Sequence, residues 1–197
     1  MGAPIRLVAG LGNPGREHLA TRHNAGFWFA DGLAARLGVP FVNEVKFQGQ
    51  VARATQDLRI LKPATFMNLS GRSVAGLARF FAIDPDEILV VHDELDLLPG
   101  DARMKFGGGI AGHNGLRDIA AQLGTPDFWR LRIGIGHPRD SVIPERQVVD
   151  YVLTPPSPDE RPAIEAAINR CLDVWPEIAS GDFERAMMVL HTRKENP

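Results

Sequence analysis

Amide and imidazole side chains recur after apolar runs of this chain, at positions where chemistry is possible. The set comprises Asn13, His23, Asn68, His92, Asp93, His113 and Asn114. An imidazole has an ordinary pKa of about 6.5 and can act as a general base near neutral pH, while a neighbouring carboxylate fixes its tautomer and stabilises its charged form. Asparagine amides add donors and acceptors. The combination predicts a hydrolase that activates water and holds an ester or amide carbonyl without a covalent intermediate.

Each of these residues also has a purely structural interpretation. Asn13 precedes a Pro-Gly pair, which is typical of a turn. Asn68 and Asn114 precede helical patterns, which is typical of helix caps. His23 can be a hydrogen-bonded polar residue at a helix start, and Asp93 can hold a loop backbone. Both interpretations stay open on the sequence alone.

Three other chemistries fit less well. Gly10, Gly12 and Gly15 have the spacing of a dinucleotide fingerprint, but Pro14 removes an N–H where a helix would meet the pyrophosphate. Cys171 lies on the apolar stripe of a helical pattern, where an inert core thiol is expected, and no serine fits a nucleophile elbow. The six histidines are scattered and form no His-Glu-x-x-His motif. We therefore expect neither a metal nor a cofactor.

Apolar periodicity predicts elements that alternate between strand and helix. Strands are expected at residues 5–11, 51–54, 58–61, 88–91, 103–106 and 129–135, and helices at 24–38, 74–81, 116–123, 164–175 and 183–190. Asn68 or Ser70 can cap the second helix, and Pro176 is expected to end the fourth. The alternation indicates an α/β layered domain. We expect one domain over residues 1–191 and a frayed tail over 192–197.

The composition limits the class of protein. The chain has 197 residues, 44% of them hydrophobic, and a formal charge of −2. It can bury one sizeable core and is not a generally basic nucleic-acid coat. A single cysteine excludes an internal disulfide framework. The sequence has neither a signal-peptide pattern nor an apolar run of membrane length, so we expect a cytoplasmic protein without a membrane partner.

Six motifs together resemble the bacterial peptidyl-tRNA hydrolase family, whose members cleave the ester between a peptide and the 3′ end of a tRNA. The motifs are GLGNPG at 10–15, TRHNAG at 21–26, TFMNLSG at 65–71, HDELD at 92–96, GHNGL at 112–116 and RLRIGIGHP at 130–138. The motifs stand in the family's order, and the resemblance extends over most of the chain. The resemblance implies a monomeric three-layer α/β/α globule with a mixed, twisted central sheet, acting on peptidyl-tRNA without a cofactor or an obligate protein partner.

The resemblance also assigns roles to residues. It implies that His23 activates the attacking water and that Asp93 supports its basic form. It further implies that Asn13 distinguishes a blocked peptidyl group from a free aminoacyl group. Contacts with the RNA 3′ end and the first peptide units are implied for Phe66, Asn68 and Asn114, with Met67 in the same crevice. We expect His113 to contact the substrate as well.

Two positions depart from the family pattern. His18 stands where the family usually has Tyr, which keeps a ring that can stack on a base but changes its size and charge. Arg103 stands where Lys is frequent and keeps the positive charge. Together with Lys105, Arg130 and Arg132, it is expected to form a basic patch for tRNA phosphates near the glycine-rich loop at residues 107–115.

A domain that binds structured RNA without cleaving it is the alternative function, because a scaffold can persist after its chemistry is lost. The presence of both His23 and Asp93 favours the hydrolase, since a binding module has no chemical need for either. A dinucleotide-dependent oxidoreductase is the third hypothesis and rests only on the glycine spacing.

Overall fold

The apolar runs predicted as strands lie side by side in one mixed sheet. In this computed structural model, which describes residues 1–192, the order of the seven strands is β2-β3-β4-β1-β5-β7-β6. Their bounds are Leu7–Gly10 (β1), Val42–Glu44 (β2), Gly49–Arg53 (β3), Arg59–Pro63 (β4), Ile88–Glu94 (β5), Ala102–Phe106 (β6) and Trp129–Gly134 (β7). β4, β1, β5 and β7 are parallel, while β2, β3 and β6 join antiparallel at the two sides. The predicted mixed sheet is confirmed.

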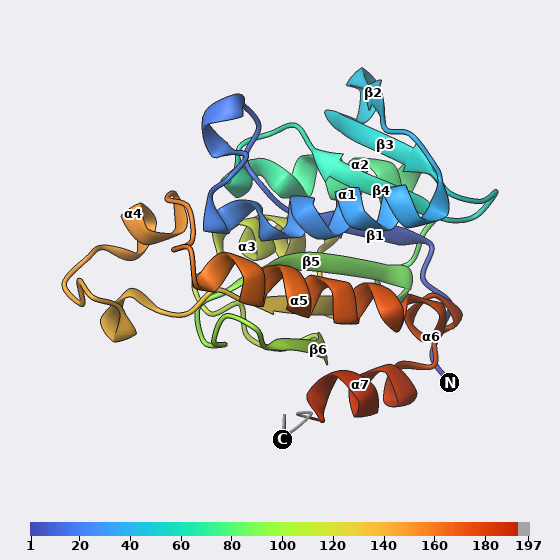
Figure 1. Ribbon diagram of the computed structural model, residues 1–197. Coiled ribbons are helices and arrows are strands. Elements are labelled where there is room, and N and C mark those ends of the chain that lie inside the picture. Colours follow the sequence, from blue (N-terminus) through green and yellow to red (C-terminus); the bar gives the residue numbers. More distant parts are fainter. Residues whose placement is uncertain (193–197) are drawn as a thin grey trace.

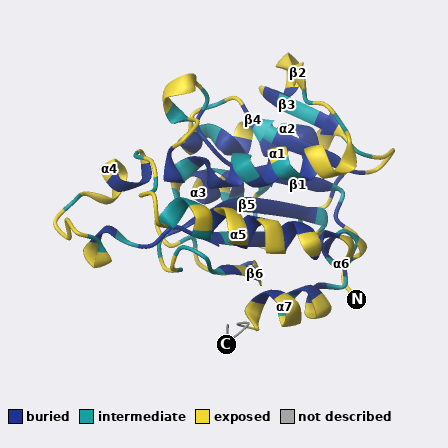
Figure 2. Ribbon diagram, in the orientation of Figure 1, coloured by how far each residue is buried: buried dark blue, intermediate teal, exposed yellow. Residues whose placement is uncertain are grey.

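Helices cover both faces of the sheet and give the fold three layers (Figure 1). Their bounds are Ala25–Leu37 (α1), Ser70–Phe80 (α2), Asn114–Leu123 (α3), Val148–Val152 (α4), Glu160–Asp173 (α5), Trp175–Ser180 (α6) and Phe183–His191 (α7). One apolar core joins the sheet to α1, α5, α6 and α7, and a second joins it to α2 and α3. Alternate residues of the central strands serve the two cores, so β1 and β5 are buried on both sides (Figure 2).

β5 is longer than its apolar run predicts. The strand expected at residues 88–91 continues to Glu94, because β7 pairs with it as far as the register of Glu94 with Gly134. His92 and Asp93 are therefore buried within the strand instead of lying in a loop after it. The central sheet thus holds the backbone of His92 and Asp93 in a fixed position.

Two expected helix boundaries are wrong. Neither Asn68 nor Ser70 caps α2, whose N-cap position is Leu69 without a side-chain capping bond. Pro176 lies in the first turn of α6 instead of ending the preceding helix, because a proline's missing N–H is not needed there. The sequence did not predict β2 and α4, which are only 3 and 5 residues long and show little periodicity.

The predicted tail and the length of the helices complete the description of the fold. The tail predicted at residues 192–197 lies outside the described residues except for Thr192. Within residues 1–192, no helix is both long and apolar enough to cross a membrane.

Two glycines let α1 approach the strand ends that carry the polar side chains. A Cβ on Gly26, in the first turn of α1, would lie 2.3 Å from the Val91 carbonyl oxygen and 2.4 Å from the Leu11 amide nitrogen. A Cβ on Gly10 would lie 2.4 Å from the Gly26 carbonyl oxygen. Larger residues would push the helix and the sheet apart. Because His23 lies just before α1, this close approach sets its distance from the end of β5.

Gly26→Ala is expected to destabilise the fold, because overpacking typically costs about 1–3 kcal/mol and the neighbours here are backbone atoms. Gly76→Ala in α2 is the matched control, since nothing lies within 4 Å of a Cβ there, and alanine is about 1 kcal/mol better than glycine inside a helix. Chemical denaturation measures both variants. Equal stability of the two would contradict the packing argument.

Candidate active site

The polar side chains converge at the carboxyl edge of the sheet, where β1, β5 and β7 end. A cavity of about 350 Å³ lies there, which we call the site cavity. Its lining comprises His23, residues 92–95, residues 110–114, His137, Val148, Val149 and Val152. Ligands of open α/β sheets bind beyond this edge, and a mainly apolar cavity with a few convergent polar groups is typical of a small-molecule site.

Asp93 holds His23 through both of its carboxylate oxygens. His23 Nδ1 lies 2.9 Å from Oδ1 and 2.9 Å from Oδ2 of Asp93. An ionised carboxylate only accepts hydrogen bonds, so Nδ1 carries the proton and Nε2 holds the lone pair. Among the described residues, Nε2 has no hydrogen-bond partner. The ring is thus fixed in the tautomer that can accept a proton from a molecule in the site cavity.

His113 is a second donor to the same carboxylate. Its Nδ1 caps α3 by accepting from the Leu116 N–H at 3.3 Å, so Nε2 carries the proton and donates to Asp93 Oδ1 at 3.0 Å. The interpretation of Asn114 as the cap is therefore wrong, and Asn114 is exposed at the site cavity. Sequence reasoning missed the contact of His113 with Asp93, because the loop that brings them together has no periodicity.

These contacts set the protonation of the site. Burial lowers the pKa of His23, but the charge and hydrogen bond of Asp93 outweigh burial and raise that pKa above its usual 6.5. Burial raises the pKa of Asp93, but His23 and His113 outweigh it and hold the pKa well below its usual range. Asp93 is therefore ionised at neutral pH and stabilises the charged form of His23.

Asn13 is oriented by three hydrogen bonds. Its backbone N–H donates to Asn24 Oδ1 at 2.8 Å, and Asn24 Nδ2 donates back to the Asn13 carbonyl oxygen at 3.0 Å. Its side-chain oxygen accepts from the Met67 N–H at 2.8 Å, so Nδ2 is left as the donor without a partner among the described residues. Sequence reasoning passed over Asn24, although its place beside His23 was the available signal.

Arg22 fastens the short helix Arg22–Asn24 to the wall of the site cavity. This buried arginine donates to the carbonyl oxygens of Tyr151 and Thr154 and pairs with Glu160 at 2.7 Å. Its guanidinium also lies 4.0 Å from the centre of the Tyr151 ring. Tyr151 belongs to α4, whose valines line the site cavity. Sequence reasoning missed this network, because Arg22 and Tyr151 are 129 residues apart in the chain.

The loop between β4 and α2 holds two residues expected at the RNA 3′ end, Phe66 and Asn68, and Met67, which is expected in the same crevice. Phe66 and Asn68 are exposed, whereas Met67 is buried in the core beneath them. None of the three lines the site cavity. His18 also lies outside that lining, half-buried, with Nε2 3.8 Å from a Glu17 carboxylate oxygen.

The basic patch contains exposed and partly paired cations. Arg103 and Lys105 are exposed on β6, and Arg103 lies opposite Arg132 of β7. Residues opposite each other in an antiparallel pair share a face of the sheet. Arg132 donates from Nε to Glu94 Oε1 at 2.7 Å and so faces the end of β5.

The prediction for Arg130 is wrong. This side chain is buried and donates to the carbonyl oxygens of Gly108, Gly109 and Pro126. Its charge holds the glycine-rich loop in place and is not accessible to phosphates. The patch therefore reduces to Arg103, Lys105 and Arg132.

Three side chains at the site cavity could hold a metal ion by distance alone. Donor atoms of His23, Asp93 and His113 lie within 4.8 Å of one another. Each imidazole donates to Asp93 through one ring nitrogen, His23 Nδ1 at 2.9 Å and His113 Nε2 at 3.0 Å, and these two nitrogens would have to lose their protons before they could bind a metal. The set therefore fits a hydrogen-bonded acid–base cluster, and the absence of a metal requirement stays a prediction.

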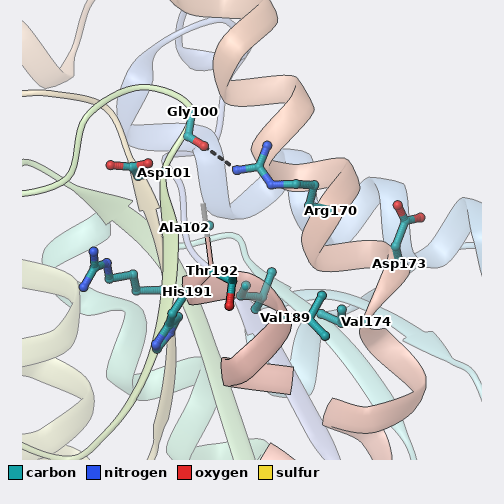
Figure 3. A pocket seen from close by; sticks show the side chains of 11 residues that line it. Gly100, Asp101, Ala102, Arg170, Asp173, Val174, Val189, His191 and Thr192 are labelled. Atoms are coloured by element: carbon teal, nitrogen blue, oxygen red, sulfur yellow. Dashed lines mark hydrogen bonds between the residues drawn. The ribbon is translucent and has the colours of Figure 1, made fainter. Parts of the chain in front are cut away.

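A larger cavity of about 1040 Å³ lies between β6, α5 and α7 (Figure 3). Arg170 reaches across it to the Gly100 carbonyl oxygen, and Asp173 pairs with Arg36 at 2.7 Å. Its lining includes neither His23 nor Asp93. Size alone therefore does not mark the site, and the chemistry points to the smaller cavity.

Comparison with known proteins gives a consistent result. A family model described as peptidyl-tRNA hydrolase matches residues 7–197. The chain is 55% identical over 195 residues to a peptidyl-tRNA hydrolase of Bordetella avium, covering 98% of this chain and 94% of the relative. It is 54% identical to one of Nitrosospira multiformis, covering 98% of this chain and all of the relative. A crystal structure of peptidyl-tRNA hydrolase from Acinetobacter baumannii is similar with a TM-score of 0.92 at 43% identity, over 98% of each chain.

Asp93→Asn is expected to lower the pKa of His23 from above 6.5 to below it, because burial remains while the stabilising charge is lost. NMR titration of the imidazole signals measures the shift. Asp96→Asn is the matched control, since it removes a nearby carboxylate that is 54% exposed and pairs only distantly, at 3.9 Å, with Arg139. A pKa of His23 that stays raised in Asp93→Asn would contradict the assignment of its cause.

Proposed function

The chain belongs to the peptidyl-tRNA hydrolase family, and we propose that His23 is the general base with which it hydrolyses peptidyl-tRNA. The observation that carries the proposal is the contact of His23 Nδ1 with both oxygens of Asp93, at 2.9 Å each. This contact leaves Nε2 as the basic atom of a ring that lines the site cavity.

The reaction steps follow from this geometry. Nε2 of His23 takes a proton from a water molecule as the water oxygen attacks the ester carbonyl carbon, and Asp93 stabilises the imidazolium that forms. The tetrahedral intermediate then breaks its bond between the carbonyl carbon and the ribose oxygen of the tRNA 3′ end. His23 returns the proton to that oxygen, which releases tRNA and a peptide with a free carboxyl group.

A water nucleophile fits the lining of the site cavity, which contains no Ser, Thr, Tyr or Cys among the described residues. Ser70 and Ser73 are buried and donate to backbone carbonyl oxygens. Cys171 is buried in α5, where burial raises the pKa of its thiol to about 12. A covalent acyl-enzyme is therefore not part of the proposed mechanism.

Asn13 is the proposed selector of the blocked substrate. Its side-chain oxygen already accepts from the Met67 N–H, and this bond fixes the orientation of the amide so that the Nδ2 donor is left for a ligand. An N–H donor pairs with the carbonyl oxygen of a peptide group and opposes the ammonium group of a free aminoacyl-tRNA.

Contacts with the RNA are proposed on either side of the site cavity. Arg103, Lys105 and Arg132 would bind phosphates, while exposed Phe66 would stack on a base near the 3′ end. Asn68, Asn114 and His18 would add polar contacts, with Met67 as the apolar support of the loop and His113 acting through Asp93. A single domain over residues 1–191, a monomeric state and a cytoplasmic location stay predictions. The comparisons offer no support for a non-catalytic RNA-binding domain.

His23→Ala is expected to reduce kcat by about 10²- to 10⁴-fold, the usual contribution of a general base, while tRNA affinity changes much less. Release of peptide from N-blocked aminoacyl-tRNA measures the rate. Near-parent turnover by a folded His23→Ala protein would overturn the proposal.

The parent protein is expected to lose activity as the pH falls through the raised pKa of His23, because the protonated ring cannot accept a proton. The activity of the parent is also expected to persist in excess chelator.

Asn13→Asp is expected to reduce discrimination between blocked and free aminoacyl-tRNA, because the carboxylate keeps the size but replaces the donor with an acceptor that attracts an ammonium group. The ratio of kcat/KM for the two substrates measures this. The Oδ1 contact with the Met67 N–H can persist in the variant, so the fold should survive. An unchanged ratio would show that Asn13 is not the selector.

Lys105→Ala and Arg132→Ala are each expected to flatten the log–log dependence of tRNA affinity on salt by about 0.7–0.9, the value for one lost phosphate contact. Arg53→Ala is the matched control, because it removes an exposed arginine from β3, far from β6 in the strand order. Slopes equal to that of the control in both variants would place the phosphate contacts elsewhere.

A further inference from the structure

We propose that His92 is a positioning residue for the hydrolysis, holding the backbone of Asp93 and the ring of His113 so that the carboxylate meets both of its donors. His92 Nδ1 lies 2.7 Å from the Asp93 carbonyl oxygen. The His92 ring also packs edge to face against the His113 ring, with centroids 4.9 Å apart. The inference rests on the proposed role of His23 and adds a residue that acts on it through Asp93.

The Asp93 carbonyl needs this donor because of where it lies in the sheet. The Val91 carbonyl accepts from the Leu11 N–H on the β1 side of β5, and the Glu94 carbonyl accepts from the Ile135 N–H on the β7 side. Carbonyls alternate along a strand, so that of Asp93 points to the β1 side, where β1 has already ended. A buried carbonyl without a partner is costly, and His92 supplies the missing N–H.

This arrangement leaves the other ring nitrogen of His92 without a hydrogen bond from residues 1–192. His92 Nε2 is buried and has no hydrogen-bond partner among the described residues, although a buried polar atom normally has one. An apolar residue would avoid that cost and could pack equally well against His113, but it would leave the Asp93 carbonyl unpaired. The imidazole is therefore retained for its Nδ1 donor.

His92 also stays uncharged beside the acid–base cluster. The titratable groups that face it are His113 from the glycine-rich loop, Asp93 from its own strand and Arg130 from β7. Burial, together with its neighbour His113, lowers the pKa of His92 to about 3. The ring thus holds Asp93 and His113 without competing with His23 for a proton.

Two variants separate the donor from the ring. His92→Phe keeps an aromatic ring against His113 and removes the donor, so kcat is expected to fall by about 10- to 100-fold through misplacement of Asp93, with little change in KM. His92→Asn keeps an N–H at the position of Nδ1 and is expected to recover most of that loss. The pKa of His23, followed by NMR titration, should fall in His92→Phe and stay near the parent value in His92→Asn.

A purely structural role predicts a different result. Thermal unfolding would then shift in His92→Phe, while kcat per folded molecule and the pKa of His23 would match the parent, and this outcome overturns the proposal. If His92→Phe does not fold, His92→Asn decides: a loss of kcat as deep as that of Asp93→Asn overturns it. If His23→Ala stays active, the proposed base fails by itself, and the titration of His23 still reports whether His92 positions Asp93.

Discussion

The structure depends on one buried charge, the carboxylate of Asp93. Taking an ionised carboxylate out of water is costly unless hydrogen-bond donors replace the lost solvent. Here the donors are imidazoles from two other segments, His23 at 70 residues' separation and His113 at 20. Each donor stabilises the charge, and the charge orients each donor. The interaction that stabilises the buried carboxylate of Asp93 therefore also orients His23, the proposed base.

The rest of the fold brings those partners within reach. The pairing of β5 with β7 continues past the apolar run and fixes Asp93 in the sheet. Gly26 lets α1 approach the strand ends, which brings His23 toward the carboxylate. Asn24 and Arg22 then tie the short helix around His23 to the β1 loop and to α4. Backbone and side-chain contacts on both sides thus restrict the ring to one position and one tautomer.

A chain with a net charge of −2 can bind a polyanion only through a local concentration of cations. We propose that Arg103, Lys105 and Arg132 provide this concentration; they lie on β6 and β7, at most two strands from β5. Two strand spacings amount to about 10 Å, so one RNA end can reach both the cations and the site cavity. Arg130 lies opposite Lys105 and so on the same face of the sheet, but its side chain is buried. It donates hydrogen bonds to carbonyl oxygens of the glycine-rich loop and is not part of the surface patch.

The sequence by itself determined the layered α/β class, the central strands and the identity of the chemical groups. Apolar alternation and the polar residues that interrupt it are local properties, and Asn13, His23 and Asp93 could be recognised by type and position. Only the tertiary structure decided which of these groups touch. The contact of His113 with Asp93, the burial of Arg130 and the extension of β5 all depend on pairings between distant segments, which no local pattern encodes. A residue's type limits the bonds it can make, but the partner that satisfies it is fixed only when the chain closes around it.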